Sequence, residues 1–422
     1  MTSNLRAGFA ALRHRNYRLY QGSQFISLIG SWMQAVSLPW LVLELGGSPL
    51  QLAAVVALQF GPATFLAPFG GVLADRIEKR KTLIVTEAAA MLQATVLFAL
   101  VITGSAEVWH VLALTFLLGL VTAVDMPVRQ AFNAELVPRD DLLNSIALNS
   151  ASFNLARVVG PAIAGVVIAL AGNGLNFALN AASYTAALIG LLLMDRAAVR
   201  AVTAASGSRV LASIAEGIRY ARRTPTILWS LVLLAGIFFF AMNFSTLLPL
   251  HAHDVLKLSG DGYGALFACM GVGALSAALL LAYLGSRPIL GLPLAAGAGF
   301  AVFEVLLGLD RVPLLAYPLM VGNGFCGMLM VNSLNGVVQW NVPDELRGRV
   351  MALWVTVFAG TVPVGAFFAG TVAQHWGSGV AFVIGGLAFG SVLAFVTWQL
   401  ARHPGVALRR APRLALEADT AP

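Results

Sequence analysis

Three ionisable side chains lie inside long apolar stretches of this 422-residue chain, where a charge is costly. They are two carboxylates, Glu87 and Glu304, and one cation, Arg157. An unpaired charge at the centre of a bilayer costs about 2.5–3.5 kcal/mol on insertion scales, so such residues are rare and mark ion or substrate pathways. A carboxylate at this depth can carry a proton across. We therefore expect these three residues to be candidates for proton coupling.

Two of these residues also have an alternative role. Glu304 lies near the end of its apolar stretch and could simply reach the membrane surface. Arg157 shares a helical face with Ser150, Asn154 and Pro161, so it could pair with a carboxylate or with a substrate. Its long side chain could equally extend to the inner membrane surface and meet a structural partner there.

Neutral polar residues within the apolar stretches form a second group of candidates. Four of the six repeat at helical spacing in the first stretch, and the set is Gln24, Ser27, Ser31, Gln34, Asn243 and Asn323. Such a face can line a substrate pathway, and Trp32 with the run Phe238–Phe240 could add an aromatic wall. The alternative is hydrogen bonding between helices, worth about 0.6 kcal/mol per bond. We expect the six residues to bind substrate.

The composition decides which elements must position these side chains. Hydrophobic residues make up 59% of the chain and charged residues 11%, too few charges for the surface of a soluble domain of this length. About 20 apolar residues cross a bilayer core as a helix. The sequence predicts an all-α membrane protein with twelve spans, at 20–45, 51–73, 82–103, 109–129, 145–170, 175–194, 226–250, 262–284, 289–308, 313–337, 350–374 and 380–401.

The basic residues predict the orientation of these spans. When the twelve spans alternate, nearly all of the 26 Lys and Arg residues fall on one side, and Lys257 and Arg311 fall on the other. Lys and Arg resist translocation, so that side is cytoplasmic and holds both termini. The net charge of +7 comes from short loops beside the membrane, which favours contact with anionic lipid headgroups over nucleic acid.

The chain divides into two halves that repeat. We expect a six-helix half at 1–194, a cytoplasmic linker with a basic amphipathic helix at 195–225, a second half at 226–401 and a disordered cytoplasmic tail at 402–422. Residues 137–167 align with 342–372, and the identities include Pro138 with Pro343, Gly160 with Gly365, and Gly165 with Gly370. Both segments leave the fourth span of a half and enter the fifth, which indicates parallel repeats.

Several kinds of chemistry have no motif in this sequence. There is no nucleotide-binding G-x-x-x-x-G-K-[ST] pattern, no His/Cys spacing for a metal and no nucleophile elbow. Cys269 and Cys326 lie in apolar runs, which argues against a disulfide. We expect no cofactor, no bound metal and no enzymatic activity, and we expect a monomer.

The loop between spans two and three carries a family motif. It reads G-V-L-A-D-R-I-E-K-R-K-T-L over residues 71–83 and resembles the G-x-L-A-D-R-x-G-R-K-x-x-L signature of the major facilitator superfamily, departing from it at Glu78. The resemblance covers roughly residues 10–400. It implies a fold of two parallel six-helix repeats that rock around a midplane site, with spans one, four, seven and ten at the cavity.

The resemblance also implies gating residues. In the family, the residue matching Asp75 contacts the start of span eleven, here near Val350, and acts as a latch between the halves. The residue matching Lys79 bridges to an acid at the end of span four, and Asp125 fits that role. The candidate gating residues are Gly71, Asp75, Arg76, Lys79, Asp125, Arg129, Gly160 and Pro161.

A narrower resemblance bears on function. The stretch from Asp125 to Ala131, and the V-P-R-D-D-L-L-N-S run from Val137, are similar to bacterial drug efflux proteins, macrolide exporters and the enterobactin siderophore exporter. Gly160-Pro161 resembles a shortened antiporter motif. The resemblance implies an exporter of a hydrophobic or amphiphilic compound in the bacterial cytoplasmic membrane, driven by proton antiport. An uptake carrier or uncoupled facilitator, and a transporter-like receptor or scaffold, are the alternatives.

Overall fold

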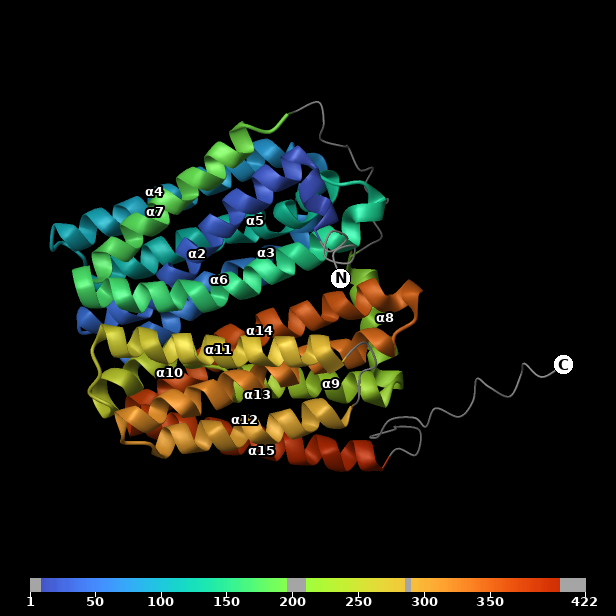
Figure 1. Cartoon of the computed structure of the whole chain (residues 1–422). Helices are drawn as coiled ribbons and strands as arrows, with labels where there is room; N and C mark the ends of the chain where they lie inside the picture. Colours follow the sequence, from blue (N-terminus) through green and yellow to red (C-terminus); the bar gives the residue numbers. More distant parts are fainter. Residues whose placement is uncertain (1–8, 196–209, 285–289, 403–422) are drawn as a thin grey trace.

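A computed structural model describes the backbone of residues 9–195, 210–284 and 290–402; side chains at 63, 65, 67–76, 143, 210–215, 344 and 345 fall outside the description. In this part of the chain all regular elements are helices, and the long ones run side by side (Figure 1). The α-helices are α2 (Arg15–Glu44), α3 (Pro49–Arg76), α4 (Lys79–Ile102), α5 (Val108–Glu135), α6 (Leu142–Ala171), α7 (Asn173–Leu192), α8 (Val210–Arg223), α9 (Pro225–Gly236), α10 (Phe244–Leu250), α11 (Gly260–Leu284), α12 (Gly291–Leu309), α13 (Pro313–Trp340), α14 (Asp344–Trp376) and α15 (Ser378–Ala401). Short turns are η1 (Ala10–Arg13), η2 (Arg139–Asp141), η3 (Ile237–Ala241) and η4 (His251–Val255).

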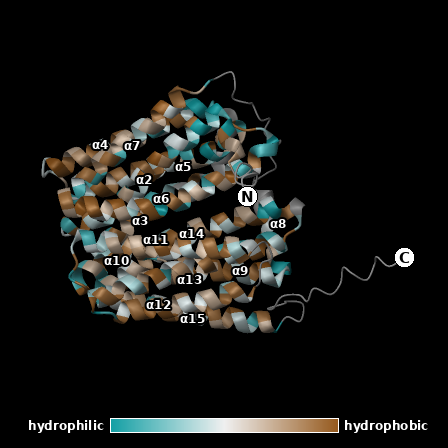
Figure 2. Cartoon of the chain, viewed as in Figure 1, coloured by the Kyte–Doolittle hydropathy of each residue, from teal (hydrophilic) through white to brown (hydrophobic). Residues whose placement is uncertain are grey.

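The number and type of the spans agree with the sequence. Eleven helices among the described residues are long and apolar enough to cross a bilayer, and Pro49–Pro62 of α3 is a further apolar stretch. The prediction of an all-α membrane protein is confirmed. Hydrophobic residues occupy most of the length of the helices, and hydrophilic residues gather at one end of the helical assembly (Figure 2). The predicted tail beyond Arg402 and residues 196–209 of the predicted linker lie outside the description.

Two ends of the helical assembly are useful for orientation. The basic end is where α2 begins, α15 ends and α8 lies (Figure 1), and it carries Lys79, Arg219, Arg349 and Arg402 among others. The far end is opposite and carries the turns at Gly46, Gly172 and Gly377, which adopt positive φ. Only glycine takes this backbone conformation at no steric cost, so these turns can be tight.

Helices α2 to α7 pack mainly on one another, and helices α9 to α15 do the same. In the first group α2 lies against α6 and α7, α3 against α5, and α4 against α5 and α7. In the second group α11 lies against α13, and α12 against α13 and α15. The two groups meet where α3 packs on α14 and α6 on α11.

The contact between α6 and α11 depends on two glycines. A Cβ atom added at Gly264 would overlap the Cα atom of Gly165, so the two backbones touch directly. Nearby, Trp40 of α2 stacks on Tyr263 of α11 with ring centres 4.9 Å apart. On the other side, Thr64 of α3 donates a hydrogen bond to the carbonyl of Ala359 at 2.9 Å. These contacts extend from mid-length to the far end, and small residues permit them.

The seventh span is discontinuous. It starts as α9, passes through the π-helical turn η3, breaks at Met242 and Asn243, and resumes as α10. Asn243 donates its Nδ2 to the carbonyl of Phe239 at 3.0 Å, which satisfies one backbone acceptor freed by the break. π-helical turns and broken membrane helices recur at functional sites because irregular backbone at membrane depth needs a protein or water partner.

The glycine contact gives a first testable prediction. Replacing Gly264 by valine forces α6 and α11 apart, and overpacking of this kind costs about 1–3 kcal/mol. We expect Gly264→Val to lower the thermal midpoint of the purified protein by several degrees. Gly360→Val is the matched control, because a Cβ at Gly360 meets nothing within 4 Å. Equal midpoints for the two variants would contradict the described contact.

Candidate functional site

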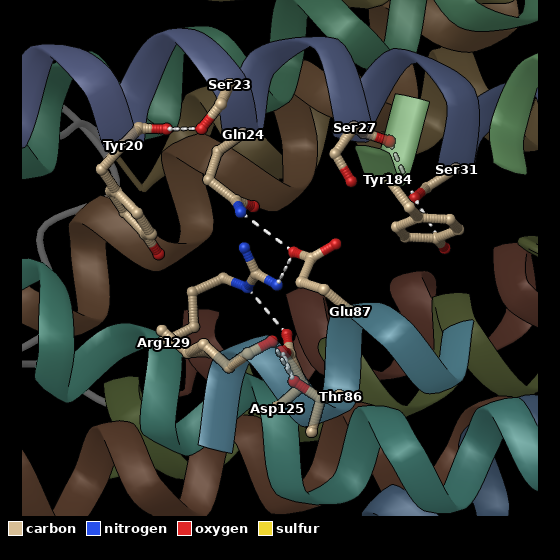
Figure 3. A network of polar contacts seen from close by, with 11 residues as sticks. Tyr20, Ser23, Gln24, Ser27, Ser31, Thr86, Glu87, Asp125, Arg129 and Tyr184 are labelled. Carbon is tan, nitrogen blue, oxygen red and sulfur yellow. Dashed lines mark hydrogen bonds and ion pairs between the residues drawn. The ribbon is translucent and has the colours of Figure 1, made fainter. Parts of the chain in front are cut away.

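An ion cluster of Glu87, Asp125 and Arg129 joins α4 to α5 (Figure 3). Arg129 donates from Nη2 to Glu87 Oε1 and from Nε to Asp125 Oδ2, both at 2.7 Å. Gln24 of α2 donates from Nε2 to the same Glu87 oxygen at 2.9 Å. The hydroxyl of Thr86 donates to Asp125 Oδ1 at 2.7 Å. The cluster therefore ties three helices together.

The charges within the ion cluster do not balance. Two carboxylates share one guanidinium, so the cluster carries one negative charge in excess when both acids are ionised. The Glu87 side chain is 1% exposed and that of Arg129 is 26% exposed. Glu87 Oε2 is buried without a hydrogen-bond partner. A proton on that oxygen would cancel the excess charge.

Local sequence places these groups. Asp125 and Arg129 stand one helical turn apart on α5 and share a face, as residues spaced by four do. Glu87 is eight residues from the start of α4, which is about 12 Å from the basic end at 1.5 Å per residue. The cluster thus lies within the helical assembly but close to one end of it.

The polar stripe of α2 faces other helices of the first group. Gln34 donates to Gln93 Oε1 of α4 at 3.1 Å and accepts from Asn180 Nδ2 of α7 at 2.7 Å. Ser31 Oγ lies 3.3 Å from the hydroxyl of Tyr184, and Ser27 is buried beside it. Gln24, Ser31 and Gln34 thus form hydrogen bonds between helices, which is the alternative role considered for these polar residues. Substrate binding by these four residues stays a prediction.

Glu304 is buried among the helices of the second group. It is 0% exposed, so it does not reach a membrane surface as its position near a helix end suggested. Asn323 of α13 donates from Nδ2 to Glu304 Oε2 at 2.9 Å, and Glu304 Oε1 has no partner. No cation pairs with Glu304 within the described part of the chain.

A small cavity lies where the two groups of helices meet. Its volume is about 20 Å³, room for roughly one water molecule. The lining comes from α6, α11, α13 and the break in the seventh span: Arg157, Met242, Phe244, Met270, Gly271, Ala274, Asn323, Gly324 and Met328. Of the six residues predicted to bind substrate, Asn323 lines this cavity, while Asn243 adjoins it through the chain.

Arg157 is held in this cavity by weak contacts. Its guanidinium carbon lies 5.6 Å from the centre of the Trp32 ring, and its Nη1 lies 3.9 Å from the sulfur of Met328. Phe153 packs edge-on against Trp32 with ring centres 5.6 Å apart. A cation over an indole face gains about 0.5–2 kcal/mol, which offsets only part of the cost of its burial.

One predicted pairing is wrong. Lys79 binds Glu135 at 2.7 Å, whereas Asp125 binds Arg129. The predicted fourth span stopped at residue 129, but α5 continues to Glu135, and these extra turns supply an acid closer to Lys79. Helix ends of this kind extend into the polar headgroup region, where hydropathy gives no signal.

The other predicted gating residues fall into two groups. Gly160 and Pro161 are buried in α6, and a Cβ at Gly160 would lie 2.5 Å from Trp32 Cβ, so this glycine permits close approach of α2. Gly71, Asp75 and Arg76 lie in the last turns of α3, whose side chains are outside the description. The latch between Asp75 and the start of α14 therefore stays a prediction.

Sequence reasoning missed several residues of the site. Thr86 gave no signal beyond its position next to Glu87, and the cavity methionines Met242, Met270 and Met328 look like ordinary apolar residues. What brings the methionines together is the packing of α11 and α13 around the break in the seventh span. The break at Met242–Asn243 could have been suspected from the Asn within an apolar run.

Comparison with known proteins identifies the family. A family model described as a transmembrane secretion effector matches residues 6–414. The staphyloferrin A transporter of Staphylococcus aureus is 23% identical over 389 residues, which are 88% of this chain and 93% of that protein. The multidrug efflux pump Tap of Mycolicibacterium fortuitum is 25% identical over 367 residues, 84% of this chain and 88% of Tap.

A solved structure shows the same fold. The nucleoside transporter NupG superposes with a TM-score of 0.71 at 12% identity, over 92% of this chain and 100% of that one. At this identity the likeness concerns the fold alone. Because the family match covers nearly the whole chain, this protein belongs to the transmembrane secretion effector family of the major facilitator superfamily, whose members are transporters and not enzymes.

Proposed function

We propose that this protein exports a hydrophobic or amphiphilic small molecule from a bacterial cell in exchange for protons. The observation that carries the proposal is the ion cluster, in which two carboxylates share Arg129 and Glu87 is almost fully buried. The oxygen Glu87 Oε2 has no hydrogen-bond partner, so it is the atom at which a proton would bind. Intramembrane ionisable groups of this kind serve proton relays in transporters.

Proton binding at Glu87 would change how the helices are held. An ionised Glu87 accepts one hydrogen bond from the Arg129 cation and one from the neutral amide of Gln24. Protonation removes the ionic part of this attraction and leaves Arg129 to Asp125 on its own helix. The attachment of α4 to α2 and α5 then weakens, so proton occupancy biases the packing of the first half. Glu304 with Asn323 is a second candidate proton site.

Alternating access would use the two groups of helices as rocking bodies. In this proposal residues 1–194 and 226–401 are the bodies, and 195–225 links them on the cytoplasmic side, where both termini also lie. The Lys79–Glu135 pair and the contact of Glu216 in α8 with Arg349 in α14 lie at the basic end. They would hold helix ends in register as the bodies move. The working unit is a monomer.

The cargo class is supported by the cavity and by the relatives. The cavity lining is mostly apolar and includes three methionines, whose flexible side chains adapt to varied ligands. Tap is a multidrug efflux pump, which supports export of drug-like compounds. The staphyloferrin A transporter supports a siderophore as the other candidate cargo.

The proposal predicts energised efflux from cells. An efflux-deficient bacterium that expresses the chain and is loaded with dyes, macrolides and catecholate siderophores should lose at least one compound faster than cells with an empty vector. A protonophore should abolish the difference, because it removes the proton gradient. Retention of every compound, with the protein verified in the membrane, would contradict broad multidrug export. Faster accumulation would indicate an uptake carrier instead.

The ion cluster predicts where coupling is lost. Glu87→Gln keeps the size and the bond from Gln24 but cannot exchange a proton. We expect proton-driven efflux in reconstituted vesicles to fall by about tenfold or more, an effect of at least about 1.4 kcal/mol. Exchange of labelled for unlabelled cargo without a gradient should persist, since it needs no net proton movement.

Glu78→Gln is the control for this variant. Glu78 pairs with Lys81 at the surface and its side chain is 53% exposed, and surface pairs of this kind contribute about 0–1 kcal/mol. The Glu78→Gln variant should therefore keep proton-driven efflux near the wild-type rate. Full proton-driven efflux in Glu87→Gln would remove this residue from the proton pathway. Full proton-driven efflux in Glu304→Gln would likewise remove Glu304, the second candidate proton site.

A further inference from the structure

Arg157 is a cation without an anion at the middle of the helical assembly. It lies about halfway along α6, and it forms no ion pair with any residue that the structure describes. Its recorded contacts are the Trp32 ring and the Met328 sulfur. Neither cancels a full positive charge. By contrast, Arg129 on the neighbouring α5 has two carboxylates.

The surroundings of Arg157 suit a ring system that bears an acidic group. Trp32 and Phe244 offer aromatic surfaces, and Met242, Met270 and Met328 offer soft apolar ones. The other polar side chain of the lining, Asn323, uses one of its two amide N–H groups on Glu304. The charged donors available to an acidic ligand in this lining are therefore those of Arg157.

We propose that this cavity binds the exported compound and that the compound is an anionic amphiphile whose acidic group pairs with Arg157 while its apolar part packs on Trp32 and the methionines. This assignment rests on the proposed transport function and narrows its substrate class. The guanidinium forms two parallel hydrogen bonds to a carboxylate or sulfonate, so it recognises the geometry of the group as well as its charge.

The cavity must enlarge before such a compound fits. Its present volume of about 20 Å³ is far below the roughly 300–1,000 Å³ of sites for drug-sized ligands. Two features permit expansion. The methionines are unbranched and change rotamer readily, and the seventh span is already broken at Met242 and Asn243. Binding is thus tied to movement of the second group of helices away from α6.

Two fluorescent probes with the same ring system test the assignment. Anilinonaphthalene sulfonate is anionic and N-phenylnaphthylamine is neutral, and their binding is measured on the full chain in nanodiscs, with empty nanodiscs as background. We expect the wild type to bind the sulfonate about tenfold tighter than the amine, the effect of one good charge-assisted contact. Arg157→Gln should abolish this preference and leave affinity for the amine within about twofold.

Two further variants make the result specific. Arg157→Lys keeps the charge and should retain much of the preference, which separates loss of charge from misfolding. Arg402→Gln is the matched control, because Arg402 also lies over an indole ring, that of Trp398 at 3.6 Å, but at the end of α15. It should bind both probes like the wild type.

The outcomes separate this inference from the proposed function. Equal affinity of the wild type for both probes, binding of neither, or a sulfonate preference that survives in Arg157→Gln overturns the anionic assignment. The measurement is made without a gradient, so it does not depend on proton coupling. If the transport proposal alone is wrong, sulfonate binding persists while energised efflux is absent.

Discussion

A bilayer core offers no hydrogen-bond partners, so each polar group at membrane depth must find its partner inside the protein. Helices meet this demand for the backbone, and Asn243 meets it where the seventh span breaks. Side chains meet it in pairs: Gln34 with Gln93, and Glu87 with Arg129. Glu87 Oε2 and the Arg157 guanidinium are among the groups left without such a pair, and the proposals above give them a proton and the cargo as partners.

Different kinds of contact hold the helices together in the two groups. In the first, amides and ionic groups on α2, α4, α5 and α7 bond across the helix interfaces, as Asn180 does to Gln34. In the second, aromatic rings dominate, and Phe300 packs edge-on against both Phe244 and Phe389. Directional bonds hold helices in one register, whereas ring and methionine contacts can slide. The second group is therefore the better suited to adapt to a ligand.

How much the sequence predicts depends on the range of the interaction involved. Hydropathy located the spans, and helical spacing placed Gln24, Ser27, Ser31 and Gln34 on one face, because both signals are local. The repeat also extends further than the aligned segments, since the same shift relates Gly172 to Gly377, both at positive φ. Partners such as Glu135 for Lys79 depend on where a helix ends and which helices are neighbours, and one sequence does not contain that information.

Helix α2 connects the proposed proton site to the proposed cargo site. Gln24 bonds to Glu87 in the ion cluster, and Trp32 on the same helix lies against Arg157. Eight residues of rigid helix, about 12 Å, separate the two contacts. Close approach of Trp32 to Gly160 leaves little room for α2 to move without α6. A change of charge at Glu87 that shifts α2 must therefore also shift the indole beside Arg157, which couples the sites without any contact between proton and cargo.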